Sequence, residues 1–377
     1  MALPRSQYVQ EGQEGIYHCF TRCVRRAFLC GFDPQTGRDF SHRKSWLVDR
    51  LRFLAAIFAI DVCAFAVMDT HCHNILRLRP DIVARWSDLE VATRWLTLFP
   101  RRRNRKQPPA PPTEEDIRAL ADQPQRIATL RQRLCSLSWF MGRLNEFIAR
   151  AANKEDKVKG RFWESRFKCQ ALLDEAAIAA CMVYVDLNPI RAGLAETPEQ
   201  SDFTSIQERI RAWKQERMAA GSVPDGAAAR PTPPVSDGIS SMVTADNHDI
   251  PNAIPEHFSV PGPVLDGWLC PIQSLPGRRG ILSITAAEYF DLVDRSGRMT
   301  RPDKRGAIDA GLAPLLHRIG ANPKVWGETV TRFGSSFRLA AGRVDNLRNF
   351  ADRLGRRWVQ GLAMAKAAFA TPQLRMQ

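Results

Sequence analysis

Two different spacings of apolar residues follow each other along the first 80 residues. Residues 16–30 begin with a run of apolar, β-branched and aromatic residues that predicts a strand followed by a turn, and residues 62–79 predict a second strand region. Between them, the apolar positions of residues 44–58 recur on one face of a helix. Strand, helix and strand in this order, with a further helix after residue 174, predict an α+β fold.

Helical periodicity dominates the middle of the chain and returns near its end. Residues 80–155 predict a helical insertion, in which apolar positions from Leu130 to Leu144 mark one strongly amphipathic helix. Residues 221–263 are rich in Pro, Ala, Ser, Gly and Asp, which indicates a flexible linker. Helices are predicted again at 285–295, 307–319 and 335–368. We therefore expect a first domain over residues 1–212, a linker over 213–264 and a basic helical accessory domain over 265–377.

The chain carries a strong positive charge. Its 377 residues contain 54 Lys and Arg against 40 Asp and Glu, which gives a net charge of +14 and a pI near 9.8. Such a surplus favours a polyanionic partner, nucleic acid above all. A basic membrane-surface protein is the competing class, but no amphipathic basic anchor stands out, and the longest apolar stretch, residues 53–68, is too short to span a bilayer.

Cysteine usage and the N-terminal residues bear on the compartment. The nine Cys include no CxxC pair, which argues against a zinc ribbon or a redox pair. The first residues lack the pattern of a signal peptide. We therefore expect reduced thiols in a cytoplasmic, nucleoid-associated protein.

The first candidate site is the pair His71 and His73. Side chains alternate along a strand, so both imidazoles are expected on one face and Cys72 on the other. Neutral imidazole is a common ligand of divalent metals, which makes the pair a candidate metal site. Two histidines at this spacing can equally be hydrogen-bonded residues of a sheet, and the pair alone does not decide between these interpretations.

The second candidate site is the segment from Tyr184 to Pro189. Asp174 is expected to cap the helix that contains Tyr184. Tyr184 and Asn188 are four residues apart, so the hydroxyl and the carboxamide can face the same site. Pro189 disfavours helical geometry at Asn188, so we expect a distorted last turn. The alternative for this pair is a packed tyrosine ring and an asparagine that caps the helix end.

Basic residues gather in two further places, before a Pro-rich stretch at 107–112 and around Phe162 and Trp163. Cations with interleaved aromatic rings suit single-stranded or hairpin DNA. The first group can equally be a solvated loop and the rings can equally be core, which we favour for Phe162. The candidate DNA-binding residues are Arg22, Arg101, Arg102, Arg103, Arg105, Lys106, Lys159, Arg161, Arg166 and Lys168.

Four blocks in order resemble the single-tyrosine HUH transposases, especially the REP-associated tyrosine transposases. The blocks are residues 17–23 (YHCFTRC), 67–73 (VMDTHCH), 160–167 (GRFWESRF) and 184–193 (YVDLNPIRAG), and the resemblance spans roughly residues 8–210. It implies a ferredoxin-like antiparallel sheet, with His71 and His73 as metal ligands, Asn188 as the third ligand and Tyr184 as the nucleophile. Thr70 and Asn74, which flank the histidine pair, depart from the residues usual in the family.

The resemblance implies a DNA transposase or single-strand endonuclease. Its cofactor would be Mg²⁺ or Mn²⁺, and its substrate single-stranded or hairpin DNA of the REP type. The intermediate would be a 5′-phosphotyrosine, with a free 3′-hydroxyl that permits strand joining. A non-catalytic DNA-binding relative and a metal-dependent phosphodiesterase that uses water stay open as alternatives, and so does a homodimer.

Overall fold

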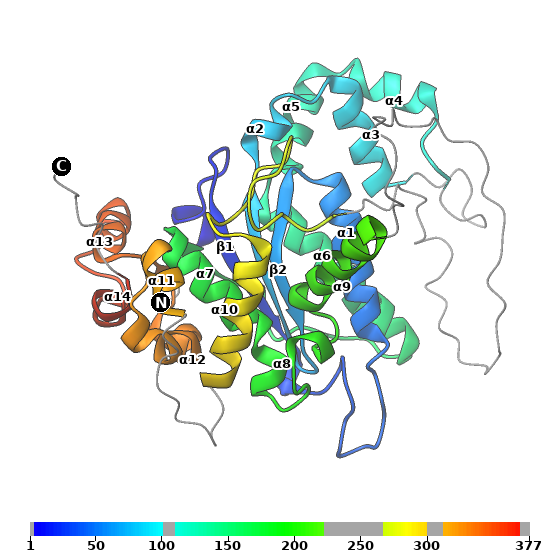
Figure 1. The fold of residues 1–377 in the computed structure, drawn as a ribbon. Helices are drawn as coiled ribbons and strands as arrows, with labels where there is room; N and C mark the ends of the chain where they lie inside the picture. Colours follow the sequence, from blue (N-terminus) through cyan, green and yellow to red (C-terminus); the bar gives the residue numbers. More distant parts are fainter. Residues whose placement is uncertain (1–3, 101–109, 222–266, 300–311, 370–377) are drawn as a thin grey trace.

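The computed structural model describes residues 4–100, 110–221, 267–299 and 312–369. These residues form an α+β structure around one five-stranded sheet, which confirms the predicted class (Figure 1). The strands lie in the order β2-β3-β1-β4-β5. The first four pair antiparallel and the short β5 runs parallel to β4, so the sheet is mixed rather than wholly antiparallel. The strands are β1 (Ile16–Arg22), β2 (Ile60–Val67), β3 (His71–Leu78), β4 (Lys168–Leu172) and β5 (Ala340–Ala341).

The predicted strand region 62–79 is two strands joined by a tight turn, so the prediction of a single strand was wrong. β2 ends at Val67, and the chain returns after Thr70 as β3, its antiparallel partner. The Met68 amide closes the turn by donating to the His71 carbonyl at 2.8 Å. The turn has neither Gly nor Pro to mark it, and both strands are apolar, so the local pattern did not reveal it.

Helices cover both faces of the sheet. The helices α1 (Arg43–Ile57) and α6 (Leu137–Glu155) pack against each other on one side, and α7 (Glu175–Asp186) lies on the other (Figure 1). The position of α1 confirms the predicted helix 44–58. Nearly every residue of β2 and β3 is buried, because helices enclose this part of the sheet from both faces.

The described residues between 80 and 155 are mainly helical, as predicted. The helix expected across Leu130 to Leu144 is divided, because α5 ends at Arg133 and α6 begins at Leu137. Leu134 within the break is fully buried, so the apolar spacing continues through a change of chain direction. The helices that precede α6 are α2 (Pro80–Val83), α3 (Asp88–Leu98), α4 (Glu114–Ala121) and α5 (Pro124–Arg133).

The chain after α7 is mainly helical. Helix α10 confirms the prediction at 285–295, and α11 covers the described part of 307–319. The predicted linker is helical as far as Gly221, and residues 222–264 lie outside the described residues. The helices are α8 (Asn188–Arg191), α9 (Ser205–Gly221), α10 (Ala286–Met299), α11 (Leu312–Arg318), α12 (Trp326–Ser336), α13 (Val344–Arg353) and α14 (Leu362–Ala368).

The single helix predicted over residues 335–368 is wrong. Helix α12 ends at Ser336, β5 joins the sheet, and α13 and α14 follow as separate helices. Gly355 and Gly361 lie between the last two, with φ values of 63° and 118° that end right-handed helical geometry. The basic residues in this region have helical spacing, but the glycines interrupt it.

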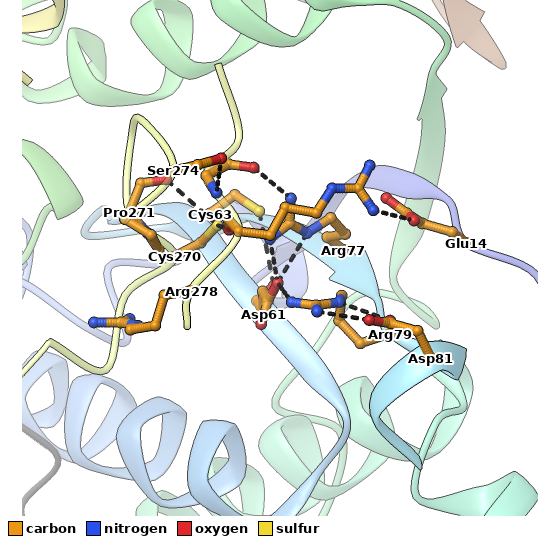
Figure 2. Close-up of polar contacts among 12 residues, drawn as sticks. Glu14, Asp61, Cys63, Arg77, Arg79, Asp81, Cys270, Pro271, Ser274 and Arg278 are labelled. Atoms are coloured by element: carbon orange, nitrogen blue, oxygen red, sulfur yellow. Dashed lines mark hydrogen bonds and ion pairs between the residues drawn. The ribbon is translucent and has the colours of Figure 1, made fainter. Parts of the chain in front are cut away.

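A buried arginine joins the C-terminal segment to the sheet. Arg77 on β3 donates to Asp61 Oδ2 on β2 through Nε at 2.8 Å and Nη2 at 2.6 Å (Figure 2). It also donates to the carbonyls of Arg279 and Gly280, each at 2.7 Å. The Arg77 side chain is 2% exposed, so these charge-assisted bonds are shielded from water and hold residues 279–280 against the sheet.

Two general properties of the described residues bear on the sequence predictions. No helix among them has the length and apolar character needed to cross a membrane. All nine cysteines are unpaired and buried. The predicted domain boundaries stay predictions.

Candidate active site

One face of the sheet gathers the histidine pair and two of the predicted cations. Residues that oppose each other across antiparallel strands share a face. His71 on β3 is opposite Arg22 on β1, and His73 is opposite Phe20. Phe20 is in turn opposite Lys168 on β4. These five side chains therefore border one area of the sheet.

Helix α7 lies over this face and carries Tyr184. The helix begins at the predicted cap, because Asp174 Oδ1 accepts from the Ala177 amide at 3.1 Å. The Tyr184 ring centroid is 5.7 Å from that of His73 and 6.1 Å from that of His18. The candidate nucleophile and the candidate metal ligands therefore lie on the same side of the sheet.

Burial keeps both histidines of the pair neutral. It lowers the pKa of His71 from 6.5 to about 4, with a smaller effect from the Arg22 charge. It also lowers the pKa of His73 well below 6.5, helped by His18 and His71. A neutral imidazole keeps one lone pair on nitrogen, which is the form that binds metals.

The hydrogen bonds of the two rings leave one nitrogen of each available. His71 Nδ1 contacts Thr70 Oγ1 at 3.0 Å, and His73 Nδ1 contacts His18 Nε2 at 2.9 Å. In the part of the chain that the structure describes, only the Nδ1 atoms of these two rings make hydrogen bonds, and neither Nε2 does. The ring centroids of His71 and His73 are 4.9 Å apart, so the two rings are close enough to contribute to one site.

The third ligand implied by the resemblance is partly engaged. Asn188 Nδ2 donates to the Tyr184 carbonyl at 2.9 Å, which is the helix-capping role of the alternative interpretation and leaves Oδ1 for a metal. Helix α7 ends at Asp186 and α8 begins at Asn188, so the last turn is interrupted as predicted. The break lies at Leu187, however, and Asn188 is itself helical, so the expected loss of helical geometry at Asn188 was wrong.

These donors fit a transition-metal ion better than Mg²⁺. Among the described residues, no three His, Cys, Asp or Glu side chains form a group that could hold a metal. A metal on His71 and His73 therefore needs oxygen from Asn188, water or substrate. Two imidazole nitrogens and an amide oxygen suit Mn²⁺ better than Mg²⁺, which prefers oxygen throughout. Metal binding stays a prediction.

Two arginines act on the Tyr184 hydroxyl. Burial raises the pKa of Tyr184 above 10, whereas Arg191, the hydrogen bond from Asn188 and Arg22 lower it. The Arg191 guanidinium carbon is 5.2 Å from the ring centroid. Sequence reasoning missed Arg191 as a site residue. Its position seven residues after Tyr184, two helical turns on, was the signal that could have indicated it.

Helix α12 packs against α7 at Tyr184. The Phe333 ring centroid is 5.9 Å from that of Tyr184, and a Cβ atom on Gly334 would lie 2.9 Å from the Tyr184 hydroxyl oxygen. Arg191 Nη2 donates to the Thr331 carbonyl at 2.5 Å. The Tyr184 ring therefore lies between the histidines and α12, a contact that no sequence pattern indicated.

The other predicted DNA-binding residues are distributed over the surface. Arg22 and Lys168 border the site, and Lys159, Arg161 and Arg166 are exposed on the segment that leads to β4. The group Arg101, Arg102, Arg103, Arg105 and Lys106 lies outside the described residues.

The two aromatic residues among these cations contribute to packing. Phe162 is 3% exposed, so the core interpretation of this residue is confirmed. Trp163 is half-buried, and its indole nitrogen donates to the Asn145 carbonyl at 2.9 Å. The exposed cations therefore remain the better candidates for contact with DNA.

Comparisons with known proteins add little to this geometry. No family model matches the chain, and no curated protein does. The structure is similar to a solved structure of a REP-associated tyrosine transposase bound to a REP hairpin, at 14% identity and a TM-score of 0.28, covering 64% of this chain and 100% of that one. A similarity at this level carries no argument, so we base the function on the site itself.

Proposed function

We propose that the chain is a single-tyrosine transposase or endonuclease of the HUH type, which cuts and joins single-stranded DNA. The main support is the meeting of two neutral histidines, each with an available Nε2, and a tyrosine on the helix above them. The strand order β4-β1-β3-β2, with α1 and α6 packed together on one face, supports the ferredoxin-like arrangement that the resemblance implies.

The charge around Tyr184 suits a phosphodiester. Arg22 on β1 and Arg191 on α8 both lower the pKa of Tyr184, so both lie close enough to act on charge at its oxygen. Guanidinium groups bind phosphate oxygens strongly. The net charge of +14 and the exposed Lys159, Arg161 and Arg166 favour a longer DNA contact.

The reaction is a transesterification at phosphorus. A divalent ion held by His71, His73 and Asn188 would polarise the scissile phosphate. The Tyr184 oxygen attacks phosphorus, the bond from phosphorus to the 3′ oxygen breaks, and a 5′-phosphotyrosine forms. The proton lost by the phenol is balanced by one gained at the 3′ oxygen, which leaves a free 3′-hydroxyl. The reverse step uses the same bonds, so joining needs no ATP.

The covalent step provides the test. Wild-type protein is incubated with Mn²⁺ and hairpin oligonucleotides taken from inverted repeats that flank its gene. We expect an adduct stable to denaturing electrophoresis, with the DNA attached to the peptide that contains Tyr184. Tyr184→Phe removes one oxygen, so the fold and DNA binding should survive while the adduct disappears.

Tyr8→Phe is the matched control, because it removes the hydroxyl of a buried tyrosine that donates to the Cys169 carbonyl. It should form the adduct as wild type does. An adduct that persists in Tyr184→Phe would contradict the assignment of the nucleophile. Equal cleavage by wild type and Tyr184→Phe without any adduct would favour attack by water, and binding without cleavage would favour a non-catalytic DNA-binding protein.

A further inference from the structure

A buried chain of hydrogen bonds ends at His73. His18 on β1 contacts His73 Nδ1 through its Nε2 at 2.9 Å and Gln170 Oε1 on β4 through its Nδ1 at 3.3 Å. His18 is 2% exposed and Gln170 is 3% exposed, so water does not compete for these groups. The three side chains come from the three adjacent strands β3, β1 and β4.

The direction of these hydrogen bonds follows from Gln170, at the end away from His73. An amide oxygen only accepts, so His18 Nδ1 must donate to Gln170 Oε1. A neutral imidazole has one N–H, so His18 Nε2 is an acceptor and His73 Nδ1 must donate to it. With the Gln170 amide in this orientation, the proton of His73 lies on Nδ1 and its Nε2 keeps the lone pair.

We infer that His18 and Gln170 are positioning residues, which hold His73 in the Nδ1–H tautomer and leave Nε2 for the metal. This inference rests on the proposed role of His73 as a ligand. With the Gln170 amide reversed, its NH₂ group would donate to His18, every donor in the chain would reverse, and His73 Nε2 would carry the proton. The orientation of one amide thus decides whether His73 can bind a metal.

His71 lacks an equivalent constraint. Its Nδ1 contacts the Thr70 hydroxyl, which can either donate or accept, so this contact fixes no tautomer. The effect of the His18–Gln170 chain should therefore be specific to His73. A merely structural role for His18 would change the stability of the sheet without selecting a tautomer at one histidine.

Nitrogen-15 NMR of histidine-labelled protein, without metal or DNA, reads the tautomer directly. We expect the His73 proton on Nδ1 in the wild type and a shift toward Nε2–H in His18→Phe and Gln170→Leu. Gln170→Glu should keep the Nδ1–H form at a pH where His18 is neutral, because a carboxylate only accepts. Ile75→Val is the matched control, since Ile75 is buried opposite His18 and takes no part in these hydrogen bonds.

Binding of Mn²⁺, followed by electron paramagnetic resonance, gives the second measurement. His18→Phe and Gln170→Leu should bind about 10- to 100-fold more weakly than the wild type, as is usual when a partner of a ligating histidine is lost. Gln170→Glu and Ile75→Val should bind as the wild type does. The wild-type and Gln170→Glu measurements keep the inference testable should His18→Phe fail to fold.

Two results would overturn the inference: a His73 proton on Nε2 in the wild type, or unchanged Mn²⁺ affinity in His18→Phe. Failure of the proposed function gives a different result. In that case the wild type would show the expected tautomer and bind Mn²⁺ but form no adduct with DNA at Tyr184.

Discussion

Replacing Asp186 with Asn should stabilise the protein at neutral pH. Asp186 is the last residue of α7, and its buried carboxylate accepts hydrogen bonds from Ser205 Oγ at 2.5 Å, the Ile206 amide at 3.1 Å and Tyr289 Oη at 2.5 Å. Burial outweighs these bonds and raises the pKa of Asp186 from 3.8 to about 6. The ionised carboxylate is therefore disfavoured in the folded protein.

The direction of this shift sets the sign of the pH effect. The folded protein binds more protons than the unfolded chain between pH 3.8 and about 6. The contribution of the neutral carboxyl of Asp186 to stability is fully present below that window and is lost as the pH rises through about 6. A shift of this size corresponds to about 3 kcal/mol. An Asn side chain resembles the neutral carboxyl and does not titrate, so it avoids this loss.

Urea unfolding of the wild type and Asp186→Asn from about pH 4 to about pH 8 measures the effect. The free energy of unfolding of the variant, relative to the wild type, should increase by about 2.5 kcal/mol over this range, because a small part of the full effect is already lost at pH 4. Ser205→Ala removes a donor that lowers the pKa of Asp186, so it should destabilise more at the upper end than at the lower. A difference between Asp186→Asn and wild type that does not vary with pH would refute the reasoning.

Three further outcomes are expected. Replacing His71 and His73 with Ala should abolish metal-dependent cleavage but retain much of the DNA binding, because cations elsewhere hold the phosphates. Cleavage and gel-shift assays with a chelator control test this, and full cleavage activity in the double variant would contradict it. Arg77→Met should lower the free energy of unfolding by roughly 3 kcal/mol and speed proteolysis near residues 279–280, because it removes the buried charged partner of Asp61. Unchanged digestion would argue against a role of Arg77 in holding residues 279–280 on the sheet. Gly334→Ala should lower the free energy of unfolding by about 1–3 kcal/mol, and with it the melting temperature, because the added Cβ would crowd the Tyr184 hydroxyl. An unaltered melting temperature would mean that α12 and α7 are not so close.

The local sequence pattern was sufficient to predict elements whose structure depends mainly on their own residues. The apolar spacing of residues 44–58 and 285–295 predicted α1 and α10, and Asp174 marked the start of α7. Alternation along a strand was enough to put His71 and His73 on one face. These properties depend on the periodicity of a single segment and on its neighbouring residues, so the sequence by itself determined them.

Contacts between distant segments were decided only by the tertiary structure. The turn after Val67 contains neither Gly nor Pro, so the local sequence did not reveal it. The glycines that separate α13 from α14 lie within a stretch whose other residues have helical spacing, so the break was not predicted. The partnership of His18 with His73, the hydrogen bond from Tyr289 to Asp186 and the approach of Gly334 to Tyr184 join residues that are 55, 103 and 150 positions apart. No local period encodes such contacts, because they arise when separate elements pack on the same sheet. The sequence thus determined the residue types that make the chemistry available, and the packing of the sheet, α7 and α12 decided which of them meet.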